Sequence, residues 1–464
     1  MKNQKPTLHF IGIGGIGMSG IARVFLDRGY AVQGSDLKPS ELMENLAKKG
    51  GKIFVGHKAN HVSQADIVVY SSSIKKDHVE MAEAVRRGLR IMHRAKALAW
   101  LCEGKHTIAI TGAHGKTTTT ALVSTIFRAA GRDPSIVLGG VVNAFGGNAF
   151  NGKGPEIIIE ADESDSSFLE FSPSTMVITN IEKEHMDHFV TMKNLKKAYG
   201  LFLNRLERGG HLVACAEDKN ILQLIKNKKG LNKTLYSLTK KGADLTAHAI
   251  QERMDGEPGI AFSIFLASKR LGKVEMKLAG RHNVLNALAA TAVGLKHGIS
   301  FRHIAKALGA FEGTGRRFDV RHRDASFLII DDYAHHPTEI RKTLRAAKTL
   351  CRDRIVAVFQ PHRYTRTEAL LKEFSRSFKD ADKLFITDIY AASEKPHPTL
   401  NGESVKIAIE KAGHPDVVFT KRLRLVREVQ KAMRPGDLVI GLGAGDITAA
   451  IQELCQSLKG ANRV

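Results

Sequence analysis

The sequence predicts an α/β protein of three domains, and two observations along the chain support that class. Short apolar runs alternate with longer segments of helical periodicity, a pattern typical of mostly parallel sheets covered by helices. Glycine-rich or polar residues follow many of these runs directly, where open α/β sheets bind ligands at the carboxyl ends of their strands. A chain of 464 residues is long enough for roughly two to four such domains.

Residues 1–104 are predicted to form a Rossmann-like N-terminal domain around a glycine-rich turn. An apolar strand at residues 8–11 leads into a GxGxxG pattern and a helix, and a second strand ends in Asp36. This order predicts a nucleotide diphosphate at the helix N-terminus. Asp36 alone also suits the ribose of NAD, so an NAD-dependent oxidoreductase stays open at this point. The glycines of the turn are Gly12, Gly14, Gly15 and Gly17.

Three consecutive serines mark a second candidate contact in this domain. Ser71, Ser72 and Ser73 follow a predicted strand at residues 66–70. Small polar residues at the carboxyl end of a strand suit ligand binding, and a simple turn explains them equally well.

Residues 105–319 are predicted to form a central ATP-binding domain, with a mostly parallel sheet and an antiparallel portion. A strand at residues 107–110 is followed by a turn with Lys-Thr and by helical periodicity over residues 119–131. Such a turn cradles phosphates, with the lysine neutralising their charge and the threonine hydroxyl binding Mg²⁺. The loop is tighter than the common GxxxxGK[ST] pattern, whose first glycine would fall at Ile110. Its residues are Gly112, Ala113, His114, Gly115, Lys116, Thr117 and Thr118.

Two acidic clusters follow the next strands of the central domain. Four carboxylates lie at residues 160–165, beginning with Glu160, directly after an apolar strand. They suit Mg²⁺ coordination, and a solvated acidic turn is the alternative. A further strand at residues 175–179 ends in a segment with His185 and His188 flanked by acids, a second candidate metal-binding cluster.

Near its end, the central domain is predicted to change from parallel strands to antiparallel hairpins. Residues 247–278 alternate apolar and polar positions around turns such as that at Asp255, which indicates antiparallel hairpins. An alanine-rich helix follows, and His282, Asn283 and Asn286 at its start could face a base. Helix capping by Asn283 is the simpler alternative.

Residues 320–464 are predicted to form a second Rossmann-like domain, with helices between its parallel strands. Its strands end in polar segments that carry His335, Arg363 and Arg366. These side chains suit the binding of carboxylate or phosphate, although surface charges at loop tips remain an alternative.

Composition limits the function classes. The formal net charge is +23, but the basic residues are spread along the chain without interleaved aromatics, so we expect no nucleic-acid partner. A nucleic-acid-stimulated ATPase stays open as the rival that the charge suggests. No apolar run approaches the ~20 residues of a membrane span, the start of the chain is polar, and the four cysteines form no CxxC pair. We therefore expect a cytoplasmic protein without membrane insertion.

The combined motifs resemble one family over nearly the whole chain, the Mur ligases of peptidoglycan synthesis. They occur in the family's order: GIGGIGMSGIA, GAHGKTTTT, EADESDSSF, GRHNVLNALAA, GTGRRF, DDYAHHPTE, FQPHRYTRT and GAGDI. The resemblance implies that ATP and Mg²⁺ serve to join L-alanine to the carboxylate of UDP-N-acetylmuramate through an acyl phosphate. EADESD and FQPHRYTRT fit this branch better than the ligase that attaches a recycled tripeptide to the same nucleotide sugar.

The resemblance also implies residue roles and a monomer or homodimer. It implies that the first glycine turn binds the UDP part of the sugar nucleotide and not NAD, with Asp36 and Ser71 to Ser73 nearby. It implies ATP phosphates at Lys116 and Thr117 and magnesium at Thr117, Glu160 and His185. The remaining implied roles are adenine contacts at His282, Asn283 and Asn286, a γ-phosphate contact at Arg317, a ribose contact at Asp332, and an amino-acid and intermediate pocket at His335, Arg363 and Arg366.

The chain departs from the family pattern at a few positions. Ala113 stands where a threonine is common, Lys183-Glu184 where Pro-Asp precedes the histidine, and Ala334 where a glycine is usual. Lys196 and Lys197 lie out of register with the carbamylated lysine of several Mur ligases, as expected for the alanine-adding branch.

Overall fold

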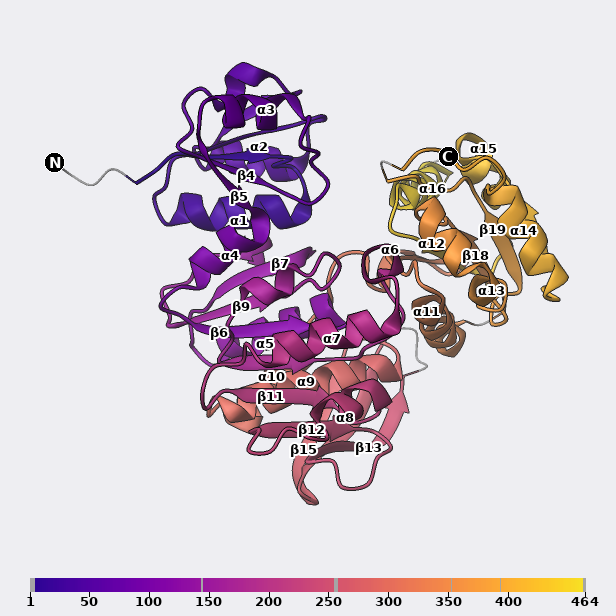
Figure 1. The fold of residues 1–464 in the computed structure, drawn as a ribbon. Helices are drawn as coiled ribbons and strands as arrows, with labels where there is room; N and C mark the ends of the chain where they lie inside the picture. The colour runs from indigo at the N-terminus through magenta and orange to yellow at the C-terminus, as the bar shows by residue number, and fades with distance from the viewer. Residues whose placement is uncertain (1–4, 143–144, 254–257, 352, 393, 462–464) are drawn as a thin grey trace. The chain divides into compact units, whose positions relative to one another are not determined.

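The computed structural model describes residues 5–142, 145–253, 258–351, 353–392 and 394–461 (Figure 1). Its strands form three sheets, of five, ten and six strands, with helices between the strands. This arrangement confirms the predicted α/β class with three sheet-containing domains. By its internal contacts the chain divides into two compact units. The first comprises Met1–Ala247, Ile264–Gly272 and Leu285–Leu308, and the second His248–Ser263, Lys273–Val284 and Gly309–Val464.

The first sheet is parallel and has the strand order β3-β2-β1-β4-β5. The chain leaves the central strand β1 in one direction and returns to its other side with β4, so a crevice for ligands forms at the carboxyl end of β1. The elements are β1 Leu8–Ile11, α1 Ile16–Asp27, β2 Val32–Asp36, α2 Glu41–Lys48, β3 Lys52–Val55, η1 Ala59–Val62, β4 Ile67–Tyr70, α3 Val79–Arg86, β5 Arg90–His93 and α4 Arg94–Cys102.

The second sheet has the order β15-β14-β13-β12-β11-β10-β6-β9-β7-β8. Its strand β6 lies between β9 and β10, parallel to both, so three loops from distant parts of the chain leave the same edge. The elements are β6 His106–Thr111, α5 Lys116–Ala129, β7 Ser135–Val142, β8 Gly147–Phe150, β9 Glu156–Glu160, η3 Ser167–Glu170, β10 Thr175–Ile178, α6 Met186–Phe189, α7 Met192–Leu203, β11 His211–Cys215, α8 Lys219–Ile225, β12 Lys233–Ser237, β13 Leu245–Glu252, β14 Ile260–Leu266, β15 Lys269–Met276, α9 Arg281–Lys296 and α10 Phe301–Ala310.

The third sheet has the order β16-β17-β21-β18-β19-β20, and only its edge strand β16 is antiparallel to its neighbour among the described pairs. Apolar residues from β17, β18 and β21, including Ile330, Phe359 and Ile440, are fully buried in its core. The elements are β16 Asp319–Arg323, β17 Leu328–Asp332, α11 Pro337–Leu350, β18 Ile355–Phe359, α12 Tyr364–Ala369, α13 Leu371–Phe374, β19 Lys383–Ile386, α14 Gly402–Lys411, β20 Val417–Phe419, α15 Arg422–Ala432, β21 Leu438–Leu442 and α16 Ile447–Ala461.

Within the first unit, helix α1 packs against strand β8 at the edge of the second sheet and against its neighbour β7. The Asn148 side chain donates to the Ser19 hydroxyl over 2.9 Å, and Arg28 Nε donates to Asn151 Oδ1 over 3.2 Å. A Cβ added to Gly20 would lie 3.2 Å from the Asn148 amide, so this glycine permits the close approach. The first two sheets are therefore joined by a packed interface as well as by the chain.

Two details differ from the pattern of the sequence. Helix α5 begins at Lys116, earlier than the apolar periodicity from residue 119 indicates, because its first turn carries buried threonines. Gly139 and Gly140 lie within strand β7, although a glycine pair is more typical of a loop, and the Gly139 amide donates to Glu160 Oε2 over 2.9 Å. The predicted turn at Asp255 lies outside the described residues.

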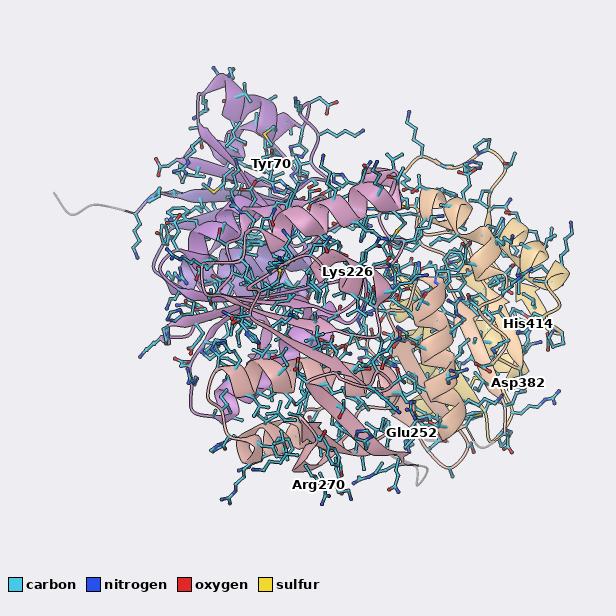
Figure 2. All side chains as sticks on the ribbon, turned by 60° about the horizontal axis from the view of Figure 1, so that its bottom comes forward. Tyr70, Lys226, Glu252, Arg270, Asp382 and His414 are labelled. Atoms are coloured by element: carbon cyan, nitrogen blue, oxygen red, sulfur yellow. The ribbon has the colours of Figure 1, made fainter. Side chains whose placement is uncertain are left out.

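In the view of Figure 2, many side chains that extend outward from the ribbon end in nitrogen atoms, in keeping with the dispersed basic residues of the sequence. Among the described residues, none of the helices combines the length and the apolar character needed to cross a bilayer.

Candidate active site

The glycine turn of the first sheet contacts Asp36 directly. The Gly14 amide donates to Asp36 Oδ2 over 2.9 Å, and a Cβ on Gly14 would lie 3.0 Å from the same oxygen. Gly12 has a φ of 79°, and Gly15 is the N-cap of α1. The structure thus brings the glycine turn and the acid at the end of β2 to one place, at the N-terminus of α1.

The loop between β6 and α5, residues 112–118, is the predicted phosphate loop, and it requires glycine at two positions. Gly112 has a φ of 136°, and a Cβ there would lie 2.1 Å from Thr179 Oγ1. Gly115 has a φ of 80°, and a Cβ there would lie 2.6 Å from Asn286 Oδ1. Neither position admits a side chain, which gives the tight form of the loop a steric cause.

The end of strand β10 holds the backbone of this loop. Asn180 Oδ1 accepts from the His114 amide over 2.9 Å, and the Asn180 Nδ2 group donates to the His114 carbonyl over 2.9 Å. The Thr179 hydroxyl donates to the same carbonyl over 2.6 Å. Sequence reasoning missed Thr179 and Asn180, since their role depends on β10 lying beside β6.

Lys116 lies among acidic side chains. Its ammonium donates to the Gly112 carbonyl over 2.6 Å and to Glu163 Oε1 over 2.7 Å. Burial opposes the charge on Lys116, but the carboxylates of Glu163, Asp162 and Glu160 outweigh it and raise the lysine pKa. Lys116 therefore stays protonated at neutral pH. Glu163, which the sequence placed only within an acidic cluster, is its direct partner.

Thr117, Glu160 and His185 were predicted to hold magnesium. The Thr117 hydroxyl donates to Glu160 Oε1 over 3.1 Å, so these two oxygen ligands are adjacent. His185 Nε2 lies 3.7 Å from Glu163 Oε1, with the histidine backbone in a left-handed conformation at the start of α6. Burial raises the pKa of Glu160, because its carboxylate loses hydration there, while the charge of Lys116 opposes the rise. Adjacent hard oxygens and surplus carboxylates fit a divalent cation such as Mg²⁺.

The first turns of α9 carry the three predicted adenine contacts. Asn286, in the first unit, accepts from the Thr119 hydroxyl over 3.3 Å at its side-chain oxygen, beside the phosphate loop. Asn283, in the second unit, donates from its side chain to the Ala279 carbonyl over 2.7 Å, which ties the helix start to the preceding turn. Burial, with Lys342 and Arg317 nearby, lowers the pKa of His282 to about 3 and keeps it neutral.

In the second unit, Arg317 and Asp332 lie around Tyr333. The Arg317 guanidinium is 5.0 Å from the centre of the Tyr333 ring and 3.4 Å from Glu339 Oε1. Asp332 accepts from the backbone amides of Phe318 and Ala334, each over 2.7 Å. Burial raises the Asp332 pKa to about 6. These contacts fix the chain entering and leaving β17, where both residues were predicted to contact the nucleotide.

The polar pocket predicted at the end of β18 is formed by arginines and histidines. Arg366 Nη1 lies 3.2 Å from His362 Nδ1, and the His335 and His362 ring centres are 5.9 Å apart. Burial, followed by the charge of Arg366, lowers the pKa of both imidazoles, that of His362 to about 3. Arg363 precedes α12 with a φ of 67° and a ψ of 136°, a strained backbone for a residue with a side chain. Two neutral imidazoles therefore lie near the Arg366 guanidinium, and the Glu339 carboxylate lies 3.5 Å from His335 Nδ1.

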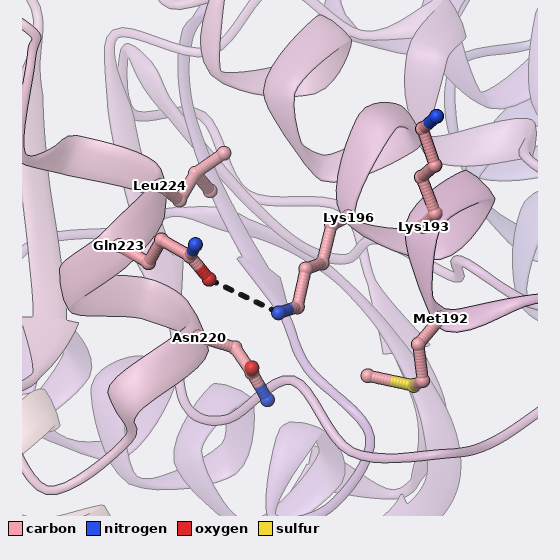
Figure 3. Close-up of a pocket in the computed structure, with 6 residues that line it drawn as sticks. All are labelled: Met192, Lys193, Lys196, Asn220, Gln223 and Leu224. Atoms are coloured by element: carbon pink, nitrogen blue, oxygen red, sulfur yellow. Dashed lines mark hydrogen bonds between the residues drawn. The ribbon is translucent and has the colours of Figure 1, made fainter.

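A separate pocket of about 410 Å³ lies between α7 and α8 in the first unit (Figure 3). Lys196 Nζ donates to Gln223 Oε1 across it over 3.1 Å. The predicted site residues, all within the described part of the chain, are absent from its lining, which is formed by Met192, Lys193, Lys196, Asn220, Gln223 and Leu224.

Three family models match consecutive parts of the chain. The Mur ligase family catalytic domain matches residues 7–106, the Mur ligase middle domain residues 110–294, and the Mur ligase glutamate ligase domain residues 316–445. Together these matches cover most of the chain, so the chain belongs to the Mur ligase family.

Comparison with individual relatives shows which members of the family this chain is similar to. The chain is 45% identical to the UDP-N-acetylmuramate–L-alanine ligase of Anaeromyxobacter sp. strain Fw109-5, over 98% of both chains. The solved UDP-N-acetylmuramate–alanine ligase MurC of Thermotoga maritima superposes with a TM-score of 0.84 at 28% identity, covering 98% of this chain and all of that one. A murein peptide ligase from Psychrobacter arcticus shares the fold, with a TM-score of 0.72 at 23% identity over 98% of both chains.

Proposed function

We propose that this protein joins L-alanine to the carboxylate of UDP-N-acetylmuramate with the energy of ATP, as a step in making peptidoglycan precursors. The observation that carries the proposal is the phosphate loop with Lys116 held by Glu163 and Thr117 beside Glu160. The full-length similarity to UDP-N-acetylmuramate–L-alanine ligases supports the choice of substrates.

The proposed reaction has two displacement steps. A carboxylate oxygen of the sugar attacks the γ-phosphorus of ATP, and ADP leaves, which gives an acyl phosphate. The amine of L-alanine then attacks the acyl carbon, and inorganic phosphate leaves with the amide bond formed. Since a carboxylate and a polyphosphate repel each other, fixed cations are needed where they meet.

The roles of the chain's own residues follow from this chemistry. Lys116 neutralises phosphate charge, and the amides at the start of α5 bind phosphate oxygens. Thr117, Glu160 and His185 hold Mg²⁺, which when bound supplies charge neutralisation at the phosphates. The glycine turn with Asp36 and the serines after β4 bind the UDP group. Arg317 and Asp332 contact ATP, and His335, Arg363 and Arg366 bind L-alanine and the anionic intermediate.

The test is phosphate release by the purified protein with Mg²⁺, ATP and UDP-N-acetylmuramate, with each amino acid and the recycled tripeptide offered in turn. L-alanine is expected to give the highest kcat/KM, and glycine and serine are the informative competitors. Faster turnover with the tripeptide would assign the protein to the peptide-recycling branch instead.

Two further arms of this experiment address the other functions that the sequence left open. DNA is expected to leave phosphate release unchanged, and a rise would favour a nucleic-acid ATPase. NAD is expected to give no thermal shift, and a clear shift would favour an oxidoreductase. We also propose a reducing, cytoplasmic setting, supported by the wide spacing of the four cysteines in the sequence and the lack of a CxxC pair.

A further inference from the structure

The loop that follows β9 is linked to the first sheet by a continuous set of side-chain contacts. Arg94, the first residue of α4, donates from Nη2 to Asp162 Oδ2 over 2.9 Å and lies 3.5 Å from Asp165 Oδ2. The Ser72 hydroxyl donates to the same Asp165 oxygen. His93 Nε2 lies 3.0 Å from the Ser72 hydroxyl and 3.7 Å from Asp165 Oδ2.

Each end of this set of contacts reaches one of the two proposed ligand sites. On one side, Ser72 belongs to the serine segment after β4, and a Cβ on Gly17 of the glycine turn would lie 3.8 Å from Arg94 Nη1. On the other side, Asp162 and Asp165 flank Glu163, the direct partner of Lys116. Arg94 thus lies between the proposed UDP site and the phosphate loop.

The contacts of Arg94 and Ser72 can pass a conformational change from the first sheet to the loop after β9. The Arg94 side chain is only 20% exposed and that of Asp165 17%, so solvent screens the ion pair less than at an open surface. Asp165 Oδ1 also accepts from the Ser167 amide over 3.0 Å, and Asp162 Oδ1 from the Ser164 amide over 3.0 Å. A change at Arg94 or Ser72 therefore reaches the backbone of the loop that carries Glu163.

We infer that Arg94 is a positioning residue that couples sugar-nucleotide binding on the first sheet to ATP binding at Lys116. The inference rests on the proposed function, since it takes the glycine turn and the serines as the sugar-nucleotide site. A sugar nucleotide bound there orders Ser72 and the guanidinium of Arg94. These in turn hold Asp162 and Asp165, and with them Glu163, in the arrangement that receives ATP. Arg94 acts through the acidic loop and does not bind either ligand strongly by itself.

The experiment is a binding cycle by calorimetry on the full chain. The affinity of a non-hydrolysable ATP analogue with Mg²⁺ is measured without and with saturating UDP-N-acetylmuramate. In the unchanged protein the sugar nucleotide is expected to tighten the analogue by about 5-fold or more, the lower range of typical coupling between sites. In Arg94→Ala this ratio is expected to fall close to 1, while each ligand alone binds within about threefold of its normal affinity.

Matched variants separate coupling from other roles. Asp162→Asn is expected to lose the same coupling, and the double variant to lose no more than either single one, because both act through one contact. Arg94→Lys keeps the charge and should retain part of the ratio, and these two variants carry the test if Arg94→Ala does not fold. Arg90→Ala, an exposed arginine on the preceding strand, should keep the full ratio.

The outcomes distinguish the inference from the function on which it rests. An active ligase whose Arg94→Ala variant keeps the full ratio, or whose unchanged form shows no coupling, overturns the inference and leaves the function standing. A large loss of UDP-N-acetylmuramate affinity in the absence of the analogue would make Arg94 a direct ligand contact and also overturns it. A protein that binds no UDP-N-acetylmuramate at all refutes both.

Discussion

Lys116 belongs to the proposed ATP site and not to the proposed UDP site, so its substitution tests whether the two sites are separate. Its ammonium offsets three carboxylates and belongs to the phosphate loop alone. Lys116→Ala is expected to lower the rate of phosphate release by about 10³-fold, the scale of removing one preorganised charge at a transition state. Binding of UDP-N-acetylmuramate, measured by calorimetry, should stay within about threefold. Lys96→Ala, at an exposed position on α4, is the control. Loss of sugar-nucleotide binding in Lys116→Ala would contradict the separation of the two sites.

Arg363 combines a needed side chain with an unfavourable backbone. Its φ of 67° and ψ of 136° suit only glycine, although its amide donates to the Tyr390 carbonyl over 2.8 Å. Arg363→Gly and Arg363→Ala both remove the guanidinium, so both are expected to lose most ligase activity. In urea unfolding, the glycine variant should be more stable than the alanine variant by roughly 1–3 kcal/mol. Equal stabilities would show that the strain is relieved elsewhere.

At the residue scale the sequence predicted the groups that a motif carries, among them Lys116, Thr117 and Glu160. It did not predict the pairing of Lys116 with Glu163 in particular, nor the hold of Asn180 on the loop. Both contacts cross between strands that are neighbours in the sheet but distant in the chain. Only the strand order decides which of several nearby acids reaches the lysine.

At the scale of elements, four segments of the first sheet converge on the fully buried carboxylate of Glu80 on α3. His9 on β1, Ser35 on β2 and His61 on η1 lie 3.2, 2.6 and 3.0 Å from its oxygens. The Lys58 amide adds a bond of 3.2 Å, and His57 lies 3.5 Å away. Burial alone would raise the Glu80 pKa, but the bonds from His9 and Ser35 outweigh it and lower the pKa to about 2.

This depressed pKa gives the element a defined pH dependence. The ionised form stabilises the fold fully above the ordinary pKa of 4.5, and that stability is lost as the pH falls toward about 2. Glu80→Gln is expected to lower the free energy of unfolding by about 1–3 kcal/mol at pH 7. Its stability should then fall less steeply below pH 4.5 than that of the unchanged protein, as measured by urea unfolding at a series of pH values.

Glu44→Gln, at an exposed position on α2, is the control for this comparison and should change neither value appreciably. Parallel pH profiles of Glu80→Gln and the unchanged protein would show that Glu80 is not the group responsible.

Element boundaries were predicted less well than element types. The start of α5 carries Thr117 to Thr120, which read as polar in the sequence but are buried. A glycine pair such as Gly139-Gly140 is more typical of a loop because glycine weakens strands, yet β7 runs through both residues. A Cβ on Gly139 would lie 2.6 Å from Glu160 Oε1, so glycine leaves room for the Glu160 carboxylate.

At the scale of the whole chain, the three sheets were predictable from the alternation of strands and helices. The packing of α1 on β7 and β8 was not, because nothing local in either segment specifies it. The first sheet and strands β6 to β12 of the second sheet lie in the same compact unit. The domain boundary at residue 104, which the sequence suggests, remains a prediction.

The single tryptophan can test whether this unit unfolds as one. Trp100 on α4 packs on Phe25 of α1 and on Tyr30, which lies between α1 and β2, with ring centres 5.2 and 5.4 Å away. Its fluorescence transition in urea is expected to coincide with the loss of hydrogen-exchange protection in β6 and β10. A fluorescence change at clearly lower urea would show that the first sheet unfolds by itself.

The α1 interface also has a consequence for how the polypeptide can be divided. A chain cut between residues 104 and 105 loses a covalent link but keeps the surface through which Asn148 meets Ser19 and Asn151 meets Arg28. The two pieces, produced separately, are expected to associate and to restore ligase activity in a concentration-dependent way. The domain boundary that the sequence predicts would therefore separate two pieces that still share a packed interface.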